Sequence, residues 1–268
     1  MRRAPRTPRD PELERQKIAD RTLETWIDDG SVRDEARHAA SRASAGTADS
    51  APPKRRAPRP LDPEVAGELT DALGKQRGAR LAERLAQASE ALDRERYQEA
   101  RRIAGAIAKE APDVAAAHEV HGLASYRLGM FKPAVRSLEA AFDLHPDPFI
   151  MPVIADCYRA LGRWSSVDRV WREIREMSPS QEVLAEGRIV AAGALADQGD
   201  LRGALAVMEP ATKRAKTVRD HHLRQYYVLG DLYDRVGDPI AARRWFGTVA
   251  ELDPEFADVE QRLRTLGR

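Results

Sequence analysis

Small, apolar and polar residues recur along this chain with a period of 33–38 residues. The clearest copy spans residues 115–148, and its marked positions are Gly122, Gly129, Phe131, Ala134, Leu138, Ala141 and Pro146. The last copy repeats the order with Leu229, Gly230, Tyr233, Gly237, Ala242, Phe246 and Pro254. Apolar residues at helical spacing on both sides of a glycine, closed by a proline, predict a helix–turn–helix repeat array.

Five such units are predicted, and two of them are irregular. The first, near 81–114, has Glu95 where the others have the turn glycine. The second, the third (near 148–180) and the fifth keep the pattern. The fourth starts near Ala185 and has Pro210 six residues earlier than the pattern requires. Because proline cannot continue a helix, we expect the second helix of this unit to be short or kinked.

A single helix is predicted at each end of the array. Leu61-Asp62-Pro63-Glu64 starts a helix whose apolar face is Val65, Leu69 and Leu73, and Gly74 ends it. Residues 255–266 form the second such helix. Terminal helices shield the ends of a stacked core. The predicted fold is therefore all-α, a right-handed α-solenoid of about five helix pairs over residues 61–268.

Residues 1–60 form a separate segment rich in Pro, Ala and Arg. Residues 1–10 and 41–60 have too few large apolar side chains to offset the entropy of ordering, so this segment is expected to be largely disordered. Short helices are predicted at about 11–28 and 32–40. The first has Leu23, Trp26 and Ile27 on one face. Either this helix docks on the solenoid or on a partner through Trp26, or it is a marginal helix without a partner.

The composition excludes several classes of protein. The chain has 44 Lys and Arg against 43 Asp and Glu, a net charge of +1, so it has no global attraction to nucleic acid. Its single cysteine, Cys157, fits a reducing compartment and a small core position. No apolar stretch follows the N-terminal arginines and no run of 18 apolar residues occurs, so we expect a cytoplasmic protein without a membrane span.

Residues 81–254 resemble the tetratricopeptide repeat family, since the set from Gly122 to Pro146 matches its consensus position by position. His118 and His121 depart from it, because the family usually has Trp and Leu there. Segments such as Arg188-Ile189-Val190-Ala191-Ala192 are also similar to bacterial tetratricopeptide proteins with Arg-rich, low-complexity N-termini, over residues 61–268. This resemblance implies the fold and a bacterial cytoplasmic setting, and it implies no particular activity.

In this fold the first helix of each pair lines a concave groove, where a protein or peptide partner binds. The residues that we expect to bind it are Glu119, Leu123, Tyr126, Arg127, Asp156, Arg159, Arg224, Tyr227, Asp231 and Arg235. Some relatives hold the C-terminal carboxylate of a chaperone with Lys and Asn. This chain has no asparagine, and acidic residues at the matching positions would repel a carboxylate, so that partner is not expected.

The insertion after Pro210 is basic, with Lys213, Arg214, Lys216 and Arg219. It is a candidate loop for an anionic ligand, and a solvated connector is the alternative. Together with the basic tail it supports a second hypothesis, an RNA- or ribosome-associated protein with weak, non-specific RNA contacts. Our first hypothesis is a non-enzymatic interaction scaffold or regulator.

No catalytic, cofactor or metal site is predicted. His118 and His121 are three residues apart, whereas the metal-binding His-Glu-x-x-His pattern requires four, so packed neutral histidines are the better interpretation.

Overall fold

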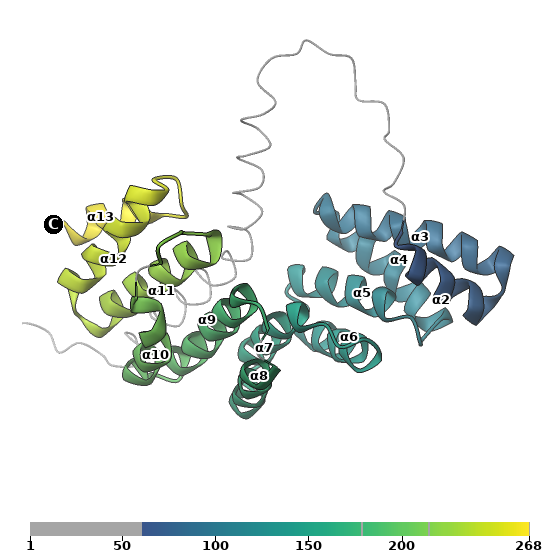
Figure 1. The fold of residues 1–268 in the computed structure, drawn as a ribbon, viewed down its shortest axis with the longest axis horizontal. Helices are drawn as coiled ribbons and strands as arrows, with labels where there is room; N and C mark the ends of the chain where they lie inside the picture. The colour runs from purple at the N-terminus through teal and green to yellow at the C-terminus, as the bar shows by residue number, and fades with distance from the viewer. Residues whose placement is uncertain (1–60, 178, 214, 268) are drawn as a thin grey trace, which may run out of the picture.

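The computed structural model describes residues 61–177, 179–213 and 215–267, and within them the secondary structure is helical throughout. The helices follow one another in a curved row, with α2 (Pro63–Leu73) at one end and α13 (Val259–Leu266) at the other (Figure 1). The predicted tail helices, with Leu23, Trp26 and Ile27, and also Arg214, lie outside the described residues.

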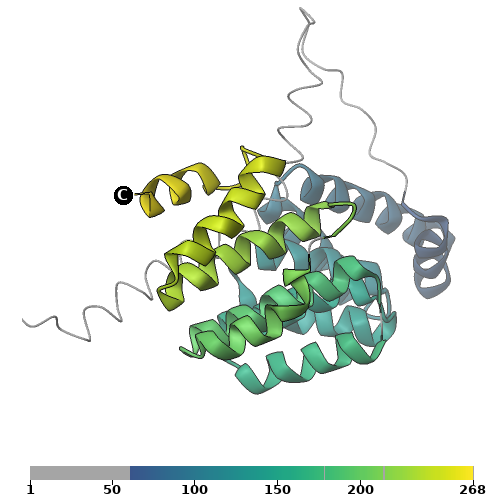
Figure 2. The ribbon, with the colours of Figure 1, turned by 60° about the vertical axis from the view of Figure 1, so that its left-hand side comes forward.

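Ten helices between these ends form five antiparallel pairs. In each pair we call the earlier helix the first helix and the later one the second helix. The pairs are α3 (Lys75–Asp93) with α4 (Tyr97–Glu110), α5 (Ala115–Arg127) with α6 (Phe131–Leu144), α7 (Met151–Ala160) with α8 (Trp164–Met177), α9 (Gln181–Asp197) with α10 (Leu201–Met208), and α11 (Asp220–Val236) with α12 (Pro239–Leu252). Two short 3₁₀ turns, Pro148–Ile150 and Glu209–Thr212, precede α7 and follow α10. Figure 2 shows consecutive helices stacked side by side, and the predicted solenoid is confirmed.

The turns within the five pairs share one backbone conformation. Gly129, Gly162, Gly199 and Gly237 have φ values of 69°, 66°, 85° and 85°. Glu95 occupies the same place in the first pair and adopts a φ of 59°. This left-handed region of the backbone is one that residues other than glycine seldom enter. The irregularity at Glu95 therefore changes the residue and leaves the turn unchanged.

Every second helix ends two residues before a proline. The helices α4, α6, α8 and α12 are each 14 residues long and end before Pro112, Pro146, Pro179 and Pro254. Helix α10 ends at Met208, before Pro210, and has only 8 residues. The predicted short second helix of the fourth unit is confirmed, and its cause is the early proline.

Glycines let the paired helices approach closely. A methyl group added at Gly122 of α5 would lie 2.6 Å from the Leu138 side chain of α6, and one at Gly230 of α11 would lie 2.8 Å from the Phe246 ring of α12. A third glycine, Gly78, lies against the backbone of α2 at the N-terminal end of the array. At these positions only glycine fits without displacing a neighbour.

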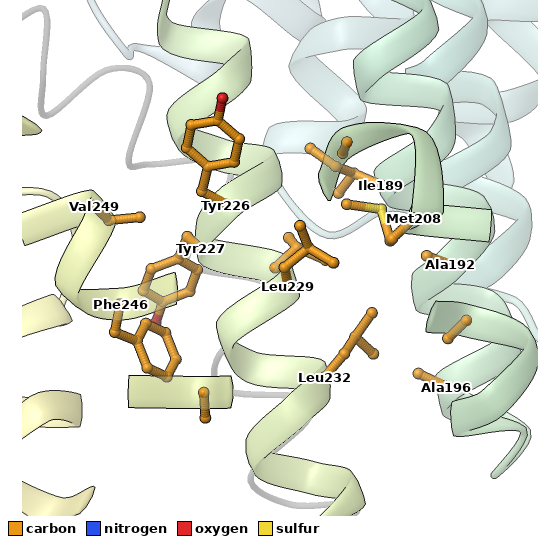
Figure 3. Packing of buried hydrophobic residues seen from close by; sticks show 14 of the residues in the cluster. Ile189, Ala192, Ala196, Met208, Tyr226, Tyr227, Leu229, Leu232, Phe246 and Val249 are labelled. Carbon is orange, nitrogen blue, oxygen red and sulfur yellow. The ribbon is translucent and has the colours of Figure 1, made fainter. Parts of the chain in front are cut away.

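The apolar core continues from pair to pair. In the C-terminal part, Leu229 and Leu232 of α11 point toward Ala192 and Ala196 of α9, while Tyr227 faces Phe246 (Figure 3). At the N-terminal end Leu69 of α2 is fully buried, and at the C-terminal end Val259 of α13 is fully buried, so both terminal helices cover the core as predicted.

Cys157 lies within the core of α6, α7 and α8 and is fully buried. Burial, followed by the neighbouring Asp156 carboxylate, raises the pKa of its thiol well above the usual range. It is the inert core residue that the sequence predicts.

The turn conformation generates a prediction. Glu95→Gly should raise the free energy of unfolding by roughly 0.5–1 kcal/mol, because glycine adopts a positive φ without the steric penalty, an advantage that its greater freedom in the unfolded chain reduces. The reverse exchange, Gly129→Glu, should lower it by about 1–2 kcal/mol. Urea denaturation of both variants measures the difference, and a less stable Glu95→Gly variant would contradict this explanation of the turn.

Candidate functional site

The ten predicted groove residues lie on three first helices. Helix α5 carries Glu119, Leu123, Tyr126 and Arg127, helix α7 carries Asp156 and Arg159, and helix α11 carries Arg224, Tyr227, Asp231 and Arg235. Most of their polar groups contact a neighbouring helix pair or the terminal helix rather than solvent alone. We call this set of interactions the polar ladder, and it links α5, α7, α9, α11 and α13.

The ladder begins between α5 and α9. The Tyr126 hydroxyl donates to Asp156 Oδ2 at 2.6 Å, and Arg159 Nε donates to Asp156 Oδ1 at 2.8 Å. Arg159 Nη1 then donates to Asp197 Oδ2 of α9 at 3.0 Å. The Arg159 side chain is only 9% exposed, so these charge-assisted bonds lie mostly out of water, where they are strongest.

The ladder continues from α9 to α13. Arg224 pairs with Glu186 of α9 at 2.8 Å, and Arg235 Nη2 donates to the Ala196 carbonyl at 2.9 Å. Asp231 accepts from Arg262 of α13, and the Tyr227 hydroxyl donates to Asp258 just before that helix. The terminal helix is thus held by polar contacts as well as by its buried Val259.

Arg127 points the other way, toward the first pair. Its Nε and Nη2 donate to the Tyr97 hydroxyl of α4 at 3.1 and 2.9 Å, and its guanidinium lies 5.2 Å from the centre of the Tyr97 ring. This cation–π contact adds to the hydrogen bonds. Arg127 therefore joins the second pair to the first.

The pKa values of the buried ladder residues depend on their burial and on their charged partners. Burial lowers the pKa of Arg159, but Asp156 and Asp197 outweigh it, so that the net shift is upward. Burial raises the pKa of Asp231, against the opposing effect of Arg262 and Arg235. Breaking one of these pairs would leave a poorly solvated charge, which is costly. The paired side chains are therefore held in fixed positions.

Glu119 is the exception among the charged groove residues. Within the described part of the chain its carboxylate has no hydrogen-bond or ion-pair partner. Burial raises its pKa, Asp147 raises it further, and His145 acts in the opposite direction. One turn along α5, Leu123 is half-buried against the α6–α8 core. Among the charged groove residues, this half-buried carboxylate beside an apolar side chain is the one without a bonded partner in the described part of the chain.

The other predicted residues are less closely grouped. Lys213, Lys216 and Arg219 are exposed in the segment before α11, which is fixed by the Ala215 amide donating to the Tyr226 hydroxyl at 3.0 Å. Their role in binding an anion stays a prediction. No group of three or more His, Cys, Asp or Glu that could hold a metal occurs in residues 61–177, 179–213 and 215–267. Within the same ranges, none of the helices is long and apolar enough to cross a membrane.

The sequence analysis placed these residues in the groove but did not predict that they bond to one another between helices. The bonded residues are one repeat apart: 30 positions for Tyr126 and Asp156, 31 for Asp231 and Arg262, and 38 for Arg159 and Asp197. Opposite charges or a tyrosine and an acid one period apart on first helices would have indicated it. The residues that sequence analysis had not singled out are Asp197, Asp258 and Arg262, and it had given Tyr97 no role beyond a repeat position.

A solved repeat protein is similar to the chain over nearly its whole length. A tetratricopeptide repeat protein from Parabacteroides merdae ATCC 43184 superimposes with a TM-score of 0.54, covering 96% of this chain and 100% of that one, at 14% sequence identity. No protein-family model matches the chain, and the search of curated proteins finds no match either. The helix pairs, their turns and this superposition agree that the chain has the tetratricopeptide-repeat fold.

Proposed function

We propose that the chain is a non-enzymatic protein-interaction module, a scaffold or regulator that binds a segment of a protein partner along its first helices, in a cytoplasmic setting. Tetratricopeptide folds generally mediate contacts between proteins. The partner we propose is an extended or helical segment that places a basic side chain at Glu119 and an apolar one at Leu123.

The observation that carries this proposal is the unsatisfied Glu119 carboxylate. A half-buried charge without a partner is unfavourable in the free protein, and a Lys or Arg from a partner would remove that cost. The other charged groove residues already have partners within the chain, so they contribute a fixed surface. A surface whose side chains are held before binding loses less entropy when a partner arrives.

The same electrostatics argue against a partner that presents a carboxylate. Burial is the main reason why the pKa of Glu119 is raised, and the nearby Asp147 carboxylate raises it further by repulsion. A second negative group at this place would increase the repulsion. The chaperone C-terminus that some relatives bind is therefore not the partner we propose.

A site-specific photocross-linker tests the surface. Placed at Leu123, it should give one discrete cross-linked product in lysate of the source organism, and Glu119→Lys should abolish that product because it reverses the charge. The matched charge reversal is Asp143→Lys, since Asp143 is exposed on α6, and the control position for the cross-linker is the exposed Ala106 of α4.

Equal products from 123 and 106, or a product that survives Glu119→Lys, would overturn the proposal. A product that nuclease removes would instead favour the RNA-associated alternative.

The unpaired carboxylate also predicts a pH dependence of stability. Because the pKa of Glu119 is raised in the folded state, its ionised form destabilises the fold, and this destabilisation grows as the pH rises through that pKa. Glu119→Gln should therefore be more stable than the parent at pH 7, and the difference should vanish below the ordinary glutamate pKa of about 4.3. Thermal unfolding measured from pH 3.5 to 8 checks this.

Asp143→Asn serves as the control and should show no such gain. If Glu119→Gln were less stable than the parent at pH 7, Glu119 would be a structural residue, and its role as a contact for a partner would be refuted.

A further inference from the structure

A cluster of basic side chains lies where α4, α5 and α6 meet, apart from the polar ladder. Helix α4 presents Arg101 and Lys109, which are separated by eight residues and therefore share one face with Gly105 between them. Helix α5 contributes His118 and His121, three residues apart. Helix α6 contributes Arg136 and its neighbour Ser137. We call Arg101, Lys109, His118, His121 and Arg136 the basic cluster.

The His121 ring is held at the centre of this cluster by two contacts. Its Nδ1 lies 2.7 Å from Ser137 Oγ. Its Cδ2 lies against Gly105, where an added methyl group would be only 2.8 Å away. When the Ser137 hydroxyl donates to Nδ1, Nε2 carries the proton, and no described residue accepts it. Gly105 and Ser137 thus fix a donor between the cations of α4 and α6.

No acid neutralises these side chains. Among the described residues, none of Arg101, Lys109 and Arg136 forms an ion pair, whereas other arginines such as Arg77 and Arg94 do. Arg101 Nε is buried and has no hydrogen-bond partner. His118 does not neutralise them either, because an imidazole is neutral or positive. Its Nε2 lies 2.9 Å from the Pro112 carbonyl oxygen, to which it donates.

The environment of His121 reflects this imbalance. Burial lowers the pKa of its imidazole, and Arg101, His118, Lys109 and Arg136 lower it further. These four charged neighbours are all bases. The positive charges of Arg101, Lys109 and Arg136 repel one another beside the two imidazoles. This repulsion destabilises the folded protein, and a bound anion would remove that cost.

We propose that the basic cluster is a binding site for a phosphate group. His121 Nε2 donates a hydrogen bond to a phosphate oxygen, and Arg101, Lys109 and Arg136 supply positive charge around it. A doubly charged group suits this set better than a single carboxylate, because several cations lack partners and a guanidinium binds two phosphate oxygens at once. The site is separate from the proposed partner surface at Glu119 and does not depend on it.

Histidine NMR with sulfate tests the site directly, because sulfate stays doubly charged while the histidines titrate. His121 is assigned with a His121→Gln variant. Sulfate should shift the His121 ring signals with a dissociation constant on the order of 1 mM, and the imidazole pKa should rise in its presence, since a bound anion favours the protonated ring.

Arg136→Gln and Arg101→Gln should weaken this binding roughly five-fold or more, because each removes a charged donor. Arg136 is exposed on α6, so its replacement keeps the fold even if that of Arg101 does not. The matched control is Arg102→Gln, an exposed arginine next to Arg101 on α4, which should bind sulfate like the parent.

The proposal is overturned if about 50 mM sulfate leaves the His121 signals and pKa unchanged, or if Arg102→Gln weakens binding as much as Arg136→Gln, which would indicate general ionic screening. Inorganic phosphate, phosphoserine and adenosine monophosphate are then compared at equal ionic strength. Tighter binding of phosphoserine supports a phosphorylated protein as the source, tighter binding of the nucleotide supports a small molecule, and binding of none of the three refutes the site.

Discussion

Close approach of the two helices in each pair is the constraint on which this structure depends. Gly122 lies against Leu138 and Gly230 against Phe246, at distances that leave no room for a side chain at either glycine. The larger residue of the second helix thereby reaches across the pair and joins a core that continues to the next one. Because one pair buries too little apolar surface to fold alone, this tight pairing is what permits stacking into an array.

Stacking then determines what the groove residues do. Tyr126, Asp156 and Arg159 connect three successive first helices, and Asp231 connects the fifth pair to the terminal helix. Residues that the sequence suggests for a partner are thus bonded within the chain, and they shape the surface rather than compete for a ligand. The proposals of binding arise at two places where charge is left uncompensated among the described residues: Glu119 on one side of α5, and the basic cluster around His121 on another.

The fold was predictable because it depends on local chemistry. Glycines in turns, prolines after second helices and small residues at the crossings each act within a few residues of their position, and even the shortened α10 followed from Pro210. The ladder was not predictable in the same way, since Arg159 and Asp197 are 38 residues apart and meet only after stacking. Periodicity also assigned His118 and His121 to packed positions. Their cationic neighbours lie on two other helices, α4 and α6, so only the structure could show that these residues come together.

Hydrogen exchange of a Gly122→Val variant tests the close pairing of helices most directly. The added side chain would collide with Leu138, and overpacking of this kind typically costs about 1–3 kcal/mol. The account predicts faster exchange concentrated in α5, α6 and the neighbouring α7, with α11 to α13 little changed. The comparison is Gly247→Ala, where an added methyl group meets nothing within 4 Å. Unchanged exchange in the Gly122→Val variant, or the same acceleration in both variants, would contradict the account.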